Sequence, residues 1–108
     1  MRFKLATLLI AMTLAAGCAS HGTPRVVNGI TIKEDKVGLW SRATLPPDSA
    51  IKIALARVPG GRITEAELEE EDGRLIYSFE IKVAGKDGED EVHVDATTGE
   101  VVKQVHEG

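Results

Sequence analysis

The sequence predicts an α+β fold in which one amphipathic helix packs on a three- to four-stranded antiparallel meander sheet. Apolar residues recur with helical spacing in segment 48–58 and alternate with polar residues in three later segments: 64–70, 75–83 and 92–94. Short connections join these segments, which favours antiparallel neighbours. A chain of 108 residues has room for one small domain with a thin core.

The helix is predicted between two proline-containing segments. Pro46 and Pro47 stand at its start, where a missing backbone N–H costs little, and Pro59 with the glycines after it ends the helix. A helix of about eleven residues is marginal in water, so it requires a sheet to pack on. Five apolar side chains share the stripe that faces this sheet: Ala50, Ile51, Ala54, Leu55 and Val58.

The first predicted strand is rich in carboxylates and ends in a tight turn. In segment 64–70, small or apolar residues alternate with Glu65, Glu67 and Glu69, which is the period of a strand with one solvated face. Asp72-Gly73 indicates a hairpin, because the favoured two-residue turn needs positive φ at both central positions.

The returning strand carries the densest apolar face of the chain. Its inward residues are predicted to be Leu75, Tyr77, Phe79, Ile81 and Val83. In the next strand we expect Val92 and Val94 to face inward and His93 to be exposed, and segment 101–105 supplies the optional fourth, edge strand.

Three stretches in this order resemble the PepSY domain. They are the helix end Val58-Pro59-Gly60, the segment Glu71-Asp72-Gly73-Arg74-Leu75-Ile76-Tyr77 and the closing segment Val92-His93-Val94-Asp95-Ala96-Thr97-Thr98-Gly99-Glu100-Val101. The resemblance covers residues 44–105. It implies a helix packed on an antiparallel sheet and a role in binding or restraining peptidases, as in the propeptides of thermolysin-like secreted metalloproteases. The family has no universally assigned catalytic or ligand residues, so none is transferred.

The first residues have the features of an export signal. Arg2 and Lys4 precede an apolar stretch, residues 5–16, that is too short to span a bilayer as a helix. The sequence that follows, Leu14-Ala15-Ala16-Gly17-Cys18, resembles the lipobox of bacterial lipoproteins, in which the cysteine is lipidated and becomes the first mature residue. Cys18 is the only cysteine, so it has no disulfide partner within the chain.

These features predict a protein of the bacterial cell envelope that is lipid-anchored at Cys18 and faces the periplasm. The resemblance to Gram-negative lipoproteins, in which an aspartate after the cysteine suggests retention in the inner membrane, favours the outer membrane, because Ala19 and Ser20 follow Cys18. Ordinary signal cleavage to a soluble periplasmic protein is the alternative, because Leu14 lies one position further from the cysteine than the usual leucine.

The predicted organisation has three parts. Residues 1–17 form the signal peptide, residues 18–43 the lipidated cysteine, a tether and a lead-in segment, and residues 44–108 the PepSY-like domain. Within the lead-in, Ile30 to Ile32 is compatible with a short strand. Lys33 to Ala43 stays open between an irregular loop and a short helix.

Composition argues against several function classes. The chain has 13 Lys and Arg residues against 17 Asp and Glu residues, a formal net charge of −4, whereas nucleic-acid binding requires a basic surface. The three histidines lack the spacing of a metal site, and no second cysteine joins them, so we expect no metal and no cofactor. No pattern marks a nucleophile with its base and oxyanion hole, so we expect no catalytic residue, no small-molecule substrate and no enzyme activity.

The candidate partner-binding residues are Glu65, Glu67, Glu69 and Trp40. The three carboxylates form a ladder that would steer a basic protein partner, or else a solvated face that discourages edge pairing. Trp40 is either a lid over the core or an exposed anchor. Two functions remain: a binding module that docks on or restrains a secreted or periplasmic peptidase, and a structural accessory subunit of an envelope assembly without an inhibitory role.

Overall fold

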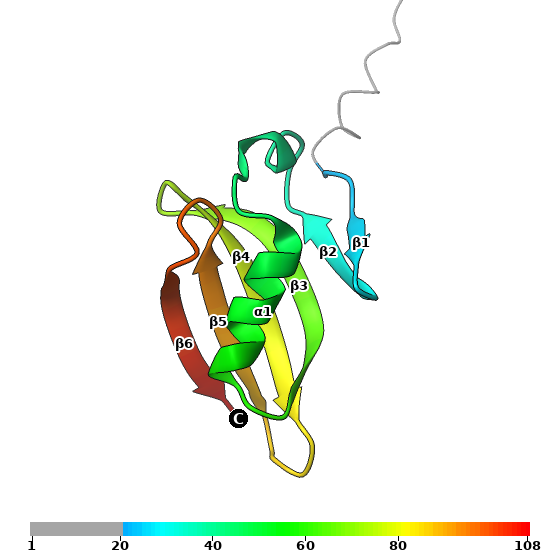
Figure 1. Cartoon of the computed structure of the whole chain (residues 1–108), viewed down its shortest axis with the longest axis vertical. Coiled ribbons are helices and arrows are strands. Elements are labelled where there is room, and N and C mark those ends of the chain that lie inside the picture. The colour runs from blue at the N-terminus through cyan, green and yellow to red at the C-terminus, as the bar shows by residue number, and fades with distance from the viewer. Residues whose placement is uncertain (1–20) are drawn as a thin grey trace, which may run out of the picture.

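The computed structural model describes residues 21–108, which form one α-helix and a single six-stranded sheet (Figure 1). The predicted export signal and Cys18 lie outside the described residues. Within 21–108, no helix has the length and apolar character needed to cross a membrane. The elements in chain order are β1 (Arg25–Val27), β2 (Ile30–Glu34), the 3₁₀ helix η2 (Trp40–Arg42), α1 (Pro47–Arg57), β3 (Gly61–Glu71), β4 (Arg74–Val83), β5 (Glu89–Asp95) and β6 (Val101–Glu107).

The sheet has more strands than the sequence predicted, and it is mixed. The α+β class is confirmed, but the three- to four-stranded antiparallel sheet is wrong. The strand order is β1-β2-β3-β4-β5-β6, with β2 parallel to β3 and all other neighbours antiparallel. The parallel pair is possible because η2 and α1 form the long crossover that such a pair needs.

The extra strands come from the segment that the sequence analysis assigned to the tether and lead-in. Arg25–Val27 forms β1 and pairs with β2 through a two-residue turn. The turn residues Asn28 and Gly29 have φ values of 52° and 78°, and the predicted hairpin residues Asp72 and Gly73 have the same two values. Both turns are therefore the mirror-image type whose twist matches the flanking strands.

The core lies between α1 and the β3, β4 and β5 strands that the helix crosses (Figure 1). Of the predicted helix stripe, Leu55 is half-buried and the other four residues are buried. The Tyr77 hydroxyl donates a 2.8 Å hydrogen bond to the carbonyl of Leu45, which ties the start of α1 to β4. Burial raises the pKa of Tyr77 to about 12. The predicted inward residues of β4 and β5 are in this core, and Ile32 of β2 joins them.

A buried carboxylate holds the lead-in segment together. Glu34 accepts hydrogen bonds from the backbone N–H of Thr23 at 2.9 Å and of Trp40 at 2.8 Å. Burial acts to raise the pKa of Glu34, but these two bonds, with others from Leu39 and Gly38, hold it below its ordinary value. The segment from Lys33 to Ala43 thus contains the end of β2, a turn over residues 35–39 and the 3₁₀ helix η2.

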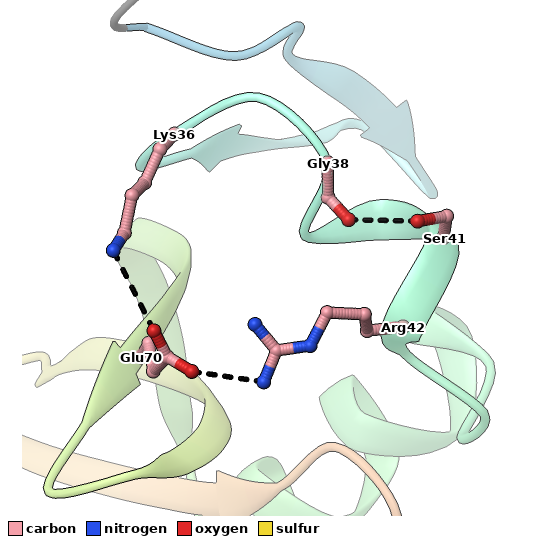
Figure 2. Close-up of polar contacts among 5 residues, drawn as sticks. All are labelled: Lys36, Gly38, Ser41, Arg42 and Glu70. Carbon is pink, nitrogen blue, oxygen red and sulfur yellow. Dashed lines mark hydrogen bonds and ion pairs between the residues drawn. The ribbon is translucent and has the colours of Figure 1, made fainter.

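Glu70 fastens the same segment to β3, as Figure 2 shows. Its carboxylate lies 2.9 Å from Nη2 of Arg42 and 3.5 Å from Nζ of Lys36. The Arg42 hydrogen bond and charge lower the pKa of Glu70. The Ser41 hydroxyl donates a 2.8 Å hydrogen bond to the carbonyl of Gly38 and closes the turn between the two cations. Exposed ion pairs contribute little stability, so their main effect is to orient the loop.

Candidate functional site

The face of the sheet opposite α1 carries three carboxylates in one cross-strand row. Glu65 of β3 is paired with Glu80 of β4, and Glu80 is paired with Glu91 of β5. Like charges directly opposite each other in a sheet are unfavourable. Lysines of the flanking strands lie beside its two outer members: Nζ of Lys33 is 3.8 Å from Glu65, and Nζ of Lys103 is 3.2 Å from Glu91. The row therefore gathers carboxylates that the sheet neutralises only in part.

Glu80 shows the effect of this crowding. A hydrogen bond with Glu89, partial burial and the negative charges of Glu65, Glu89 and Glu107 together raise the pKa of Glu80 to about 7. Glu89 accepts a 2.6 Å hydrogen bond from the Thr64 hydroxyl, which with the Glu80 contact lowers the pKa of Glu89. Glu80 is thus the member of this pair that holds the proton near neutral pH.

His93 lies in the next row of the same face and is buried. The prediction that it is exposed is wrong, since only 1% of its surface is accessible. Its cross-strand neighbour in β4 is the small Ser78, and the longer side chains of Glu71 and Glu91 reach its ring. A residue on the solvent side of a sheet is buried here by its neighbours' side chains.

The two ring nitrogens of His93 face different carboxylates. Nε2 lies 2.9 Å from Oε2 of Glu91, whose other oxygen is 3.2 Å from Nζ of Lys103. Nδ1 lies 3.4 Å from Oε1 of Glu71 and has no hydrogen-bond partner. Because both nitrogens face carboxylates rather than the hydroxyl of Ser78, these two cross-strand neighbours do not form a nucleophile–base pair.

Glu69, Glu71 and His93 form a cluster at one end of this face. One potential ligand atom of each lies within 4.8 Å of the others. Burial and the neighbouring negative charge of Glu67 raise the pKa of Glu69, although His93 acts in the opposite direction. The sequence analysis named Glu69 for its charge alone, because Glu71 and His93 reach it only through the register of β3, β4 and β5.

The structure brings some predicted site residues together and separates others. Glu65, Glu67 and Glu69 lie on β3 on the face opposite α1, and Glu65 is 3.8 Å from Nζ of Lys33. Trp40 contacts none of these carboxylates through its ring. The ring centroid lies 6.4 Å from that of Tyr77, and the indole N–H donates a 2.7 Å hydrogen bond to the carbonyl of Thr23. This placement fits the lid interpretation.

The closing segment that carries the family resemblance has a structural role. The Asp95 carboxylate accepts hydrogen bonds from the N–H of Thr98 at 2.9 Å and of Thr97 at 2.7 Å, and these bonds lower the pKa of Asp95 against its burial. The Ala96 carbonyl accepts the N–H of Leu45 at 2.8 Å and so joins this turn to the start of α1. These residues hold the β5–β6 turn and the helix in place.

Comparison of the sequence with known protein families finds a match. The family described as "Peptidase propeptide and YPEB domain", or PepSY, matches residues 44–105. The chain belongs to the PepSY family. Domains of this family are associated with peptidase propeptides and with binding roles. The match begins after η2, so the β1–β2 hairpin lies outside the matched PepSY range.

One curated relative illustrates how far the similarity extends. The uncharacterized protein YkoJ of Bacillus subtilis (strain 168) is 38% identical over 64 residues, which cover 58% of this chain and 36% of YkoJ. The chain therefore matches little more than a third of that relative's length. No solved structure matches the chain.

Proposed function

We propose that this PepSY protein is a non-catalytic binding module of the bacterial cell envelope that docks on a peptidase and restrains it. The occupant of the face opposite α1 would be a peptidase surface rich in lysine and arginine. Family membership supports the peptidase, and the charge of this face supports the basic surface.

The observation that carries the proposal is the row formed by Glu65, Glu80 and Glu91. The fold places three carboxylates opposite one another, an unfavourable arrangement that Lys33 and Lys103 compensate only at its two ends. A cationic partner would relieve the remaining repulsion on binding. Such charges act chiefly on the association rate and its salt dependence, because exposed ion pairs add little net affinity. The proposed signature is fast association at low salt that slows as salt is added.

The test uses a secreted thermolysin-like metalloprotease as the probe. Binding kinetics are measured by surface plasmon resonance at low and high salt, and hydrolysis of a peptide substrate is measured with and without the PepSY protein. The test variant is Glu65→Gln/Glu67→Gln/Glu80→Gln. The control variant, Asp35→Asn/Asp87→Asn/Glu100→Gln, removes three exposed carboxylates elsewhere.

We expect the test variant to associate about tenfold more slowly than the wild type at low salt, and the control to keep most of the wild-type rate. Slower substrate hydrolysis by the bound peptidase would support restraint. Binding without any effect on hydrolysis would limit the function to docking. Equal rates for both variants would remove the acidic face from the interface. The absence of any peptidase binding would favour the structural accessory role.

We further propose that Cys18 is acylated and anchors the module in the outer membrane facing the periplasm. The support is the sequence Leu14-Ala15-Ala16-Gly17-Cys18 after an apolar stretch. Cys18→Ser should move the protein from the membrane fraction to the soluble periplasmic fraction. Mass spectrometry of the wild-type protein should show lipid mass on the first mature residue, and a soluble, unmodified wild-type protein would contradict the anchor.

A further inference from the structure

We propose that Glu69, Glu71 and His93 form a binding site for a divalent transition-metal ion, with Zn²⁺ as the best-fitting member of that class. The potential ligand atoms of these residues lie within 4.8 Å of one another, and they come from β3 and β5. A small inward movement of three side chains would bring each atom to the distance of about 2 Å at which zinc binds nitrogen and oxygen.

The state of His93 points to a cation rather than to carboxylates alone. Its side chain is buried, and Nδ1 has no hydrogen-bond partner although it lies 3.4 Å from the Glu71 carboxylate. A buried polar atom without a partner is costly, and a nitrogen lone pair that faces a carboxylate is repelled by it. A cation between Nδ1 and the carboxylates of Glu69 and Glu71 removes both penalties.

The second ring nitrogen is arranged as in known metal-binding histidines. Nε2 lies 2.9 Å from the carboxylate of Glu91, so donation of the Nε2–H to Glu91 leaves the Nδ1 lone pair free for a metal. Lys103 holds Glu91 from the other side at 3.2 Å. Such a carboxylate partner fixes the tautomer and the ring orientation and makes the imidazole a stronger ligand.

The donor set selects the class of metal. One imidazole nitrogen and two carboxylate oxygens suit Zn²⁺ better than Mg²⁺ or Ca²⁺, which prefer oxygen ligands alone. Three protein ligands leave a fourth position for water or for a donor from a partner. Glu71 also lines an open hollow of about 310 Å³ with Asp72, Arg74, Ile76 and Val102, so this ligand is accessible from solvent.

The inference does not depend on the peptidase-docking proposal, because the ligands belong to this chain and the test needs no partner. The test uses the chain from residue 18 onward with Cys18→Ser, which keeps every described element and removes the thiol as a competing zinc ligand. Zn²⁺ binding is measured by isothermal titration calorimetry, with thermal melts in Zn²⁺ and in EDTA. The test variant is Glu69→Gln/Glu71→Gln, and the matched control, Glu65→Gln/Glu67→Gln, removes two carboxylates from the same face of β3.

We expect one Zn²⁺ per chain and a higher melting temperature in Zn²⁺ than in EDTA. The control should retain both effects, and the test variant should lose more than about 100-fold in affinity, since it lacks two ligands. Glu91→Gln should lose about 10- to 100-fold, the usual effect of changing the carboxylate behind a metal-binding histidine. An excess of Mg²⁺ should not displace the zinc.

A spectroscopic readout separates metal binding from a purely structural role of His93. In ¹⁵N-histidine NMR, added Zn²⁺ should shift Nδ1 of His93 and leave Nε2 protonated. Equal zinc affinity in the two double variants, or no binding by the parent protein, would overturn the inference. So would a His93 with both ring nitrogens protonated before and after Zn²⁺ addition, because a proton would then occupy the position proposed for the metal.

Discussion

The two faces of the sheet are both partly buried, but by different means. On the face toward α1, the residues Tyr77, Phe79 and Ile81 are covered by a helix and are apolar. On the opposite face, Ile76 and His93 are each 1% exposed, yet no element of the described chain lies over them. The side chains of Glu71 and Glu91 lie against His93, and Ile76 sits between Glu69 and Asp95 in the cross-strand pairing. Alternation along a strand therefore predicts which face a side chain occupies, whereas neighbours across the sheet determine whether it is buried.

The largest effect should come from the helix-covered face. Phe79→Ala removes a fully buried ring from the centre of the core, so it should reduce the free energy of unfolding by about 3 to 5 kcal/mol. That loss is a large share of the total free energy of unfolding of a small domain. Urea denaturation followed by circular dichroism measures the loss. Val105→Ala, at a 42% exposed position of β6, is the control and should have little effect.

The opposite face gives the sharper test of the comparison. Ile76→Ala should reduce the free energy of unfolding by about 2 to 4 kcal/mol, because Ile76 is as inaccessible as a core residue. The same denaturation measurement applies. A loss well under 1 kcal/mol would show that the covering side chains move aside readily, and that this face is exposed in solution.

A smaller effect is expected at the buried carboxylate of the lead-in. Glu34→Gln should reduce the free energy of unfolding by about 1 to 3 kcal/mol. The glutamine NH₂ would face the backbone N–H of Thr23 or of Trp40, so a donor would meet a donor where Glu34 now accepts a hydrogen bond. Fluorescence of Trp40, the only tryptophan, reports on this region directly. The exposed neighbour Asp35→Asn serves as the control, and an unchanged Glu34→Gln protein would mean that the lead-in is held by Trp40 packing instead.

The smallest effect concerns pH. The pKa of Glu80 is raised to about 7, mainly by its hydrogen bond with Glu89 and by burial, with further contributions from Glu65 and Glu107. A carboxyl group whose native pKa is raised contributes stability that is complete below its ordinary value of 4.5 and is lost as pH rises through 7.

Stability should therefore fall by about 1 kcal/mol between about pH 5 and about pH 8, a modest amount because Glu80 is only partly buried. Denaturation midpoints at the two pH values measure it. Glu80→Gln should remove most of the fall, whereas Glu100→Gln should keep it. Groups whose pKa is lowered, such as Asp95, change their protonation below about pH 5 and so do not contribute to this fall in stability. The same slope in both variants would assign the pH dependence to another group.

Much of the fold was predictable because it follows from local patterns. The helix bounds follow from Pro47 and Pro59, and the β3–β4 hairpin follows from Asp72-Gly73. The β1–β2 hairpin carries an equally strong turn signal in Asn28-Gly29, but each of its paired segments has only a few residues, so the alternation beside the turn is weak. The parallel pairing of β2 with β3 was not predictable, because it depends on the path of the crossover between the two strands and not on residues close to either strand.

The helix stripe, the inward face of β4 and the family could all be predicted from the sequence, because each depends on residues that are close in the chain. It also placed Glu65, Glu67 and Glu69 on one face, since alternate residues of a strand share a face. The tertiary structure alone decided that Glu69 lies with Glu71 and His93, and that His93 is buried. Cross-strand register sets those contacts, and a shift of one residue would turn His93 to the other face of the sheet.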